Sequence, residues 1–150
     1  VIGWRLDNDK TRGQQVARLN ELRLGIEPVA ARLAAGNATA QQRAELLRLA
    51  ARLAELESTP SPRVGEELET DLRFHTLILR ASGNEMLAAL APSLVAMLKG
   101  KSVFGSRKRD PISGTTQLHM ELARAIDAGL ADAAEETSRT ILDRTRAENG

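Results

Sequence analysis

The stretch DLRFHTLILRASGN, residues Asp71–Asn84, decides the fold class. Its apolar residues recur every three or four positions, the spacing that places them on one face of an α-helix. Gly83 and Asn84 end the pattern, and Asn84 is also suited to cap a following helix. Asp71 and His75 are one turn apart on the same face. The stretch therefore predicts an amphipathic helix that carries an acid and a histidine beside its row of leucines.

The composition favours a helical domain and excludes several classes of site. The chain has 150 residues, 42% of them hydrophobic and only 2% aromatic, so leucine and alanine must fill the core. There is no cysteine, which excludes disulfides, thiolate metal sites and cysteine nucleophiles. The net charge of +1 argues against a nucleic-acid-binding surface over the whole chain. No apolar run approaches the ~20 residues of a membrane span, and the start VIGWRLDNDK lacks the apolar region of a signal peptide. Together with the absence of cysteine, which fits a reducing compartment, this leads us to expect a cytoplasmic protein.

The same periodicity predicts six helices. They cover residues 14–35, 39–56, 66–81, 84–98, 115–128 and 132–147. Gly36 and Asn37 read as a left-handed stop, and Thr39 with Gln42 as a capping box. Two prolines make residues 58–65 a linker, residues 99–114 are predicted to form the longest loop, and Pro92 is expected to bend its helix. Amphipathic helices joined by short connections predict an all-α antiparallel bundle.

Apolar stripes predict which faces of the outer helices are buried. On the first helix the predicted inward stripe comprises Val16, Leu19, Leu22, Ile26, Val29, Ala30 and Leu33. On the last helix it comprises Ala133, Ala134, Thr137, Ile141 and Thr145.

Asp71, His75 and His119 are the candidate metal ligands. His119 shares a face with Leu122 and Ile126, so it also points toward the core. If its helix faces the one that carries Asp71 and His75, one carboxylate and two imidazoles converge, which is a ligand set for a divalent metal. The alternative is that Asp71 pairs with an arginine such as Arg73 and that each histidine simply fills the core.

Four segments, in order along the chain, resemble the FadR C-terminal domain, the ligand-sensing and dimerising half of one branch of the GntR transcription regulators. They are NELRLGIEPVAARLAA (20–35), NATAQQRAEL (37–46), DLRFHTLILRASGNEML (71–87) and HMELARAIDAGLADAA (119–134). The resemblance implies a bundle of six to seven helices. In metal-binding members the ligands are an Asp and a His in D-x-x-x-H and two later histidines. Asp71, His75 and His119 match the first three, whereas Ile141 stands where the last histidine is expected.

The resemblance also implies a pocket for a small organic acid beside a divalent metal such as Zn, Ni or Mn. Arg23 is the candidate partner of the effector carboxylate, because a guanidinium binds a carboxylate through two bonds. Its alternative is an exposed helix arginine paired with Glu27. Thr115 is expected to add a hydroxyl, or else to cap a helix, and Phe104 to wall the pocket.

The function implied is therefore effector sensing and homodimerisation without catalysis. Residues 1–13 are interpreted as a connecting segment and residues 14–150 as the effector domain. DNA is contacted only through a winged helix-turn-helix domain that we expect outside this sequence. The alternatives are a metal-dependent hydrolase, with Asp71, His75 and His119 holding the metal and Glu67 as base, and a purely structural bundle.

A cluster of basic residues in the predicted loop has two interpretations. It consists of Lys99, Lys101, Arg107, Lys108 and Arg109. Contact with phosphate is one, and a solvated loop is the other.

Overall fold

The computed structural model describes the backbone of residues 9–105 and 114–149, and the side chains of residues 13–100 and 114–145. This part of the chain contains helices and no strand, as predicted. The helices are α1 (Asp9–Asn37), α2 (Ala40–Ser58), α3 (Glu66–Ala81), α4 (Glu85–Ala89), α5 (Ala91–Gly105), α6 (Thr116–Asp127) and α7 (Ala131–Asn149). The prediction of an all-α bundle of six to seven helices is confirmed.

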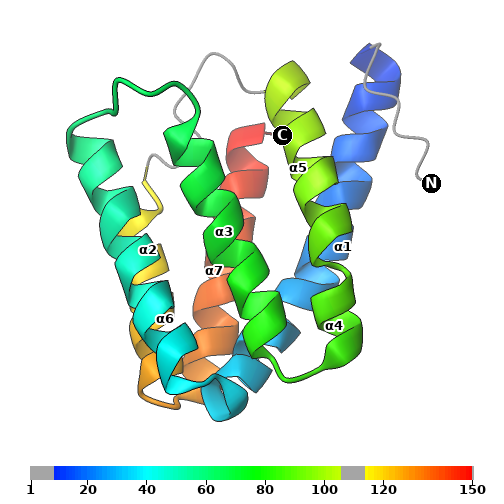
Figure 1. Ribbon diagram of the computed structural model, residues 1–150. Coiled ribbons are helices and arrows are strands. Elements are labelled where there is room, and N and C mark those ends of the chain that lie inside the picture. Colours follow the sequence, from blue (N-terminus) through cyan, green and yellow to red (C-terminus); the bar gives the residue numbers. More distant parts are fainter. Residues whose placement is uncertain (1–8, 106–113, 150) are drawn as a thin grey trace.

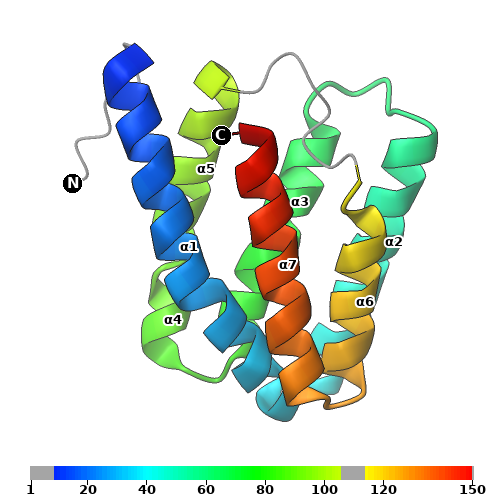
Figure 2. The same ribbon diagram turned by 180° about the vertical axis from the view of Figure 1, so that it is seen from behind.

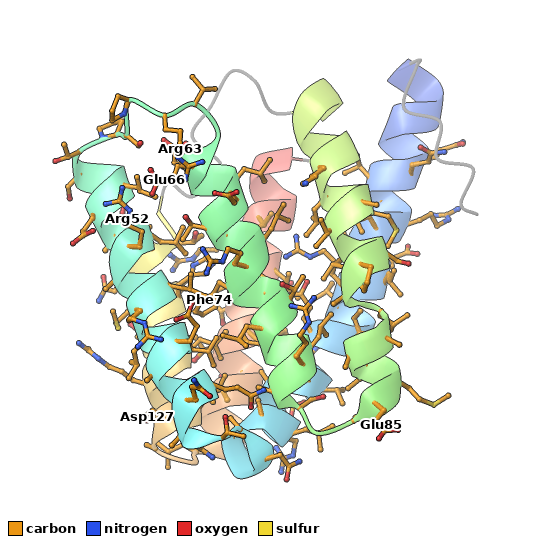
Figure 3. The ribbon with its side chains drawn as sticks, viewed as in Figure 1. Arg52, Arg63, Glu66, Phe74, Glu85 and Asp127 are labelled. Atoms are coloured by element: carbon orange, nitrogen blue, oxygen red, sulfur yellow. The ribbon has the colours of Figure 1, made fainter. Side chains whose placement is uncertain are left out.

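The helices run up and down around one core, with α4 and α5 following one another in the same direction (Figure 1). Helix α1 lies along α7, and α7 lies along α6, which Figure 2 shows from behind. Helix α2 packs on α3 and α6, and α3 also contacts α1. Helices α1, α3, α6 and α7 therefore enclose a common interior. Phe74, which is fully buried, lies in it (Figure 3).

Local sequence signals set several of the helix ends. Thr39 and Gln42 form the predicted capping box at the start of α2. The side chain of Asn84 accepts bonds from the backbone amides of Met86 and Leu87, so it caps α4 as expected. Gly83 has a φ of 76°, and an added Cβ would lie 3.1 Å from the side chain of Asn37. This turn therefore needs glycine for its backbone and for the close approach of α1.

Other helix ends differ from the prediction. Helix α1 begins at Asp9 and continues through Asn37, so the predicted left-handed stop at Gly36 is wrong. The predicted bent helix over residues 84–98 is two helices, α4 and α5. Pro92 lies in the first turn of α5, where its missing N–H has no helical partner to lose. Helix α5 also continues through Gly105, so Lys99 and Lys101 are helical, whereas Arg107, Lys108 and Arg109 lie outside the described residues.

The buried face of α1 is the largest departure from the predicted stripes. Leu22 and Val29 are 41% and 44% exposed, although the stripe placed them inside. Arg23 and Glu27 are 4% and 3% exposed and take the inward positions. On α7, Ala133 is likewise exposed, whereas Ser138 is buried. Helix α1 therefore brings an ion pair, rather than a leucine row, to the middle of the bundle.

Two charged connections hold the ends of the bundle. The guanidinium of Arg43 donates to the carbonyls of Ala35 and Ala38 and to those of Ile126 and Asp127, so it ties α1 to the end of α6. At the opposite end, Arg52 and Arg63 both approach Glu66 at the start of α3 (Figure 3). Within the described ranges, no helix has the length and apolarity that crossing a bilayer requires.

Candidate metal and effector site

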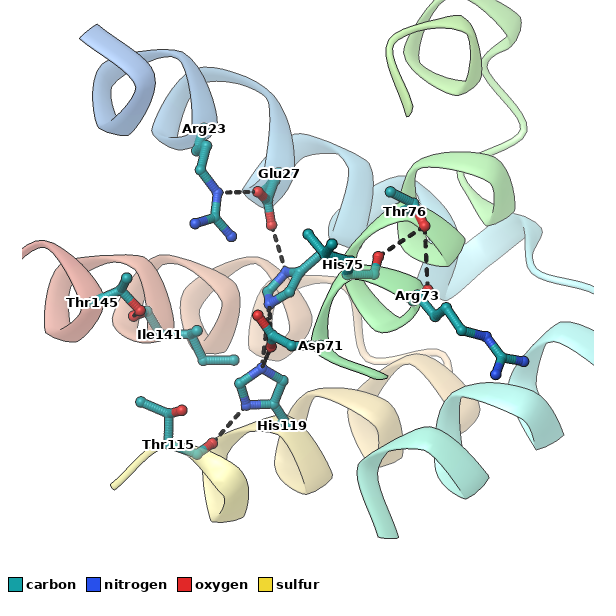
Figure 4. Close-up of polar contacts among 11 residues, drawn as sticks. Arg23, Glu27, Asp71, Arg73, His75, Thr76, Thr115, His119, Ile141 and Thr145 are labelled. Carbon is teal, nitrogen blue, oxygen red and sulfur yellow. Dashed lines mark hydrogen bonds and ion pairs between the residues drawn. The ribbon is translucent and has the colours of Figure 1, made fainter. Parts of the chain in front are cut away.

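The three predicted metal ligands meet in the interior of the bundle. Asp71 and His75 come from α3 and His119 comes from α6 (Figure 4). The two Nε2 atoms are 3.2 Å apart, and Asp71 Oδ1 lies 3.0 Å from His119 Nε2 and 3.3 Å from His75 Nε2. Both histidines are buried and the Asp71 side chain is 23% exposed. The alternative pairing of Asp71 with Arg73 is not formed, since Arg73 pairs with Glu45.

Each histidine ring is oriented by an acceptor at its other nitrogen. His119 Nδ1 lies 2.7 Å from the backbone oxygen of Thr115, and His75 Nδ1 lies 2.7 Å from Glu27 Oε1. A carbonyl and a carboxylate can only accept, so both Nδ1 atoms must carry hydrogen. In the neutral rings both Nε2 atoms then direct lone pairs at the same point, as they do in protein metal sites.

The spacing of the three ligand atoms suits a metal ion. Donors about 2.0–2.1 Å from a tetrahedral zinc lie about 3.3–3.4 Å from one another. The observed separations of 3.0, 3.2 and 3.3 Å are close to this. One carboxylate and two neutral imidazoles are ordinary ligands for zinc and for other divalent metals. Asp71, His75 and His119 can therefore hold three corners of a coordination shell with little rearrangement.

Glu27 is the residue at this site that sequence reasoning did not identify. It was considered only as an exposed partner for Arg23. The two do pair, with Arg23 Nε 2.6 Å from Glu27 Oε2, but the pair is buried and its second carboxylate oxygen holds His75. A signal existed in the spacing. Arg23 and Glu27 continue the buried row that starts at Leu19 and ends in the alanines around Ala30.

The charges at the site shift one another's pKa values. Burial would raise the pKa of Glu27, but Arg23 and His75 outweigh it and lower that pKa to about 2. Burial likewise opposes ionisation of Asp71, yet the charge of His75 and the polar contact with His119 hold its pKa well below the usual value. Burial would lower the pKa of His75, but the carboxylates of Glu27 and Asp71 raise it to about 9. Without a metal, the His75 ring therefore holds a proton at neutral pH.

The guanidinium of Arg23 lies inside the bundle and has donors that no described residue uses. Its side chain is 5% exposed, and among the described residues only Nε has a partner. The two terminal nitrogens make no hydrogen bond to any residue that the structure describes. Figure 4 shows the group pointing from α1 toward α7, where Thr145 and Ile141 lie. Because buried donors are nearly always paired, these nitrogens are suited to an anionic ligand.

Of the remaining predicted residues, the structure describes the side chains of Ile141, Thr115 and Glu67 but only the backbone of Phe104. Ile141 is 1% exposed on α7 and points toward the cluster, so no fourth protein ligand comes from this position. Thr115 is buried at the N-cap position of α6, and its carbonyl, rather than its hydroxyl, is what orients His119. The backbone of Phe104 lies in α5, but its side chain is outside the described residues. Glu67 makes no hydrogen bond or ion pair with the cluster in the described part of the chain.

The family model of the FCD domain matches residues 18–144. The chain belongs to the FCD domain family. This confirms the resemblance to the FadR C-terminal domain that the sequence segments indicated.

Two relatives of this FCD domain agree with the assignment. The galactonate operon transcriptional repressor of Escherichia coli strain K12 is 28% identical over 145 residues, which are 95% of this chain and 60% of the repressor. The solved structure of Streptococcus agalactiae GntR superposes with a TM-score of 0.77 at 25% identity, over 97% of this chain and 64% of that one. The chain therefore spans less than two thirds of the length of either relative.

Proposed function

We propose that this FCD domain is the effector-sensing and dimer-forming half of a cytoplasmic bacterial transcription regulator of the GntR type. A divalent metal on Asp71, His75 and His119, together with Arg23, binds a small organic acid. The acid stabilises one arrangement of the bundle and so changes the DNA affinity of a domain outside this sequence. A coupling of this kind is typically worth ~1–3 kcal/mol.

The charge balance of the site carries the proposal. When His75 is neutral, the charges of Arg23 and Glu27 cancel, since the two are paired at 2.6 Å. Asp71 cancels one of the two positive charges of a divalent metal, so one positive charge remains in a buried space. A carboxylate neutralises it and also supplies the coordination position that Ile141 leaves open. An anion that reaches both the metal and Arg23 is therefore favoured over a neutral ligand.

The name of the Escherichia coli relative supports a sugar acid as the first class to test. That protein is named for the galactonate operon, and galactonate combines a carboxylate with hydroxyl groups. An α-hydroxy acid of this type can chelate a metal through the carboxylate and the adjacent hydroxyl. Galactonate, other aldonates and simple hydroxy acids thus form the effector panel for this domain.

The first experiment measures metal content and acid binding on matched variants. Elemental mass spectrometry should find close to one divalent metal per chain in the wild type and little in His75→Ala. In the metal-loaded wild type, acids of the panel should raise the melting temperature, because ligands that bind the folded state stabilise it. Arg23→Met should keep the metal and lose most of this shift.

The controls make the result specific. Glu21→Gln changes an exposed acid on the same helix and should behave as wild type. Sedimentation should show a dimer, for which the exposed Leu22 and Val29 on α1 offer apolar surface. A wild type without metal, and without a melting shift from any acid, would overturn the proposal.

Zinc binding is expected to tighten about tenfold per pH unit from about pH 6.5 toward 9, and then to level off. The pKa of His75 is raised to about 9, so below that value the metal must displace a proton, and binding weakens as the pH falls. Glu27, with its pKa near 2, and Asp71, with a pKa well below normal, stay ionised throughout and add no slope. Competition with a chelator of known affinity at several pH values measures this. A dissociation constant that does not change over this range would contradict the proton competition.

The alternative functions are less well supported. A hydrolase needs a base at the metal, and Glu67 has no contact with the cluster in the described residues. A purely structural bundle does not account for the buried Glu27, His75 and His119 beside Asp71, because burying charged groups generally costs stability compared with apolar side chains. Turnover of a small ester by the metal-loaded protein would favour the hydrolase.

A further inference from the structure

The carboxylate of Glu27 lies between two donors that bind its two different oxygens. Arg23 Nε donates to Oε2 at 2.6 Å, and His75 Nδ1 donates to Oε1 at 2.7 Å. Arg23 and Glu27 are four residues apart on α1, so both side chains reach the interior from one face. All three side chains are at least nine-tenths buried, and water does not readily replace either bond.

The two partners of Glu27 differ in what they can accept. A guanidinium has donors only and never accepts a hydrogen bond. A neutral imidazole can present either a donor or an acceptor at Nδ1, depending on its tautomer. The group at position 27 must therefore offer an acceptor to Arg23 in every case, and what it offers to His75 decides which nitrogen of that ring carries hydrogen.

We propose that the Arg23–Glu27 pair is a positioning device that fixes His75 in the tautomer whose Nε2 can bind a metal. This inference rests on the proposed metal site and adds a role for two residues that do not touch the metal. Arg23 takes one oxygen of Glu27, so only a carboxylate has a second acceptor left for His75 Nδ1. With hydrogen held at Nδ1, the lone pair of Nε2 faces Asp71 and His119.

The device makes an unusual prediction for the isosteric variant Glu27→Gln. A glutamine has a single acceptor oxygen, and the Arg23 cation binds it more strongly than a neutral imidazole does. The amide NH₂ then faces His75 Nδ1 as a donor and forces hydrogen onto Nε2. A side chain of almost unchanged shape should thus turn the ring from a metal ligand into a donor to Asp71.

The experiment compares zinc affinity in wild type, Glu27→Gln, the double variant Arg23→Met/Glu27→Gln, and the control Glu21→Gln. Glu27→Gln should weaken zinc binding about 10–100-fold, the usual effect of losing an outer partner of a metal ligand. The double variant should recover most of this loss, because without Arg23 the glutamine can turn its oxygen toward His75. Glu21→Gln, on the exposed side of α1, should bind as wild type does.

Long-range ¹H–¹⁵N spectra of the two histidines give a second readout that does not depend on metal. Recorded well above the His75 pKa of about 9, where the ring is neutral, the spectra should place its hydrogen on Nδ1 in the wild type and on Nε2 in Glu27→Gln, whereas His119, held by the Thr115 carbonyl, should not change. Equal zinc affinity in wild type and Glu27→Gln would overturn the inference, as would an equal loss in the single and double variants. If the wild type binds no zinc, the proposed metal site fails, and the His75 spectrum alone then decides the role of Glu27. Far-ultraviolet circular dichroism confirms that each variant is folded.

Discussion

Replacing Ile141 by histidine is expected to tighten zinc binding at least about tenfold, which corresponds to ~1.4 kcal/mol. Ile141 points from α7 toward the cluster and is 1% exposed, so a ring at this position faces the side that Asp71, His75 and His119 leave open. The added imidazole supplies a fourth protein ligand and makes the shell that of a closed structural site. Chelator competition measures the change in affinity, and the d–d spectrum of the cobalt-loaded protein reports the coordination.

The matched control is Ile141→Leu, which keeps the volume and adds no ligand. It should bind zinc as the wild type does. A fourth protein ligand also takes the position that we assign to the effector, so Ile141→His should bind organic acids more weakly while it binds metal more tightly. The same zinc affinity in both variants would show that residue 141 does not reach the metal position.

Phe74→Ala is expected to lower the free energy of unfolding of the metal-free domain by about 3–5 kcal/mol. Phe74 is fully buried, and its ring centroid lies 4.9 Å from that of His119 and 5.5 Å from that of His75, with both rings in edge contact. Truncation leaves a cavity next to the two imidazoles and removes the surface against which both rings rest. Urea unfolding in the presence of a chelator measures the loss without a contribution from bound metal.

Phe74→Leu fills part of the same space and should lose less stability than Phe74→Ala. Phe74→Ala should also bind the metal more weakly than the wild type does, because the two imidazole rings lose a packing surface that limits their rotation. A loss below about 1 kcal/mol in Phe74→Ala would mean that the bundle closes around the cavity, contrary to the packing described here.

Much of the fold was predictable because the relevant signals are local. The apolar spacing of residues 71–84, the capping box at Thr39 and the cap at Asn84 each act over a single turn, and the structure retains all three. Asp71, His75 and His119 were predicted to converge because each lies on the apolar face of its helix and because the sequence resembles the family. The end of α1 was placed too early because Gly36 was interpreted as a left-handed stop, whereas its backbone stays helical. The end of α5 was missed because no strong local signal marks it.

The inward face of α1 was harder to predict, for a physical reason. Periodicity counts apolar residues as buried, so Leu22 and Val29 were placed inside and the charged Arg23 and Glu27 outside. The buried pair becomes favourable only when His75, 48 positions farther along the chain, is beside Glu27. That partner belongs to another helix, and its position cannot be read from the sequence of α1 alone. The exposed leucine and valine leave apolar surface for a second subunit in the proposed dimer.

Pro28 follows Glu27 directly, inside α1. Proline lacks an N–H, so the Leu24 carbonyl loses its usual partner and the helix is weakest in bending beside the site. The nineteen residues from Asp9 to Glu27 span about 27 Å, since the eighteen steps between them each rise 1.5 Å. Were α1 to bend beside Glu27, a tilt of about 5° there would displace Asp9 by about 2 Å, since displacement grows with length. A sub-ångström adjustment around His75 would thus become a larger displacement at the end of α1 farthest from the site.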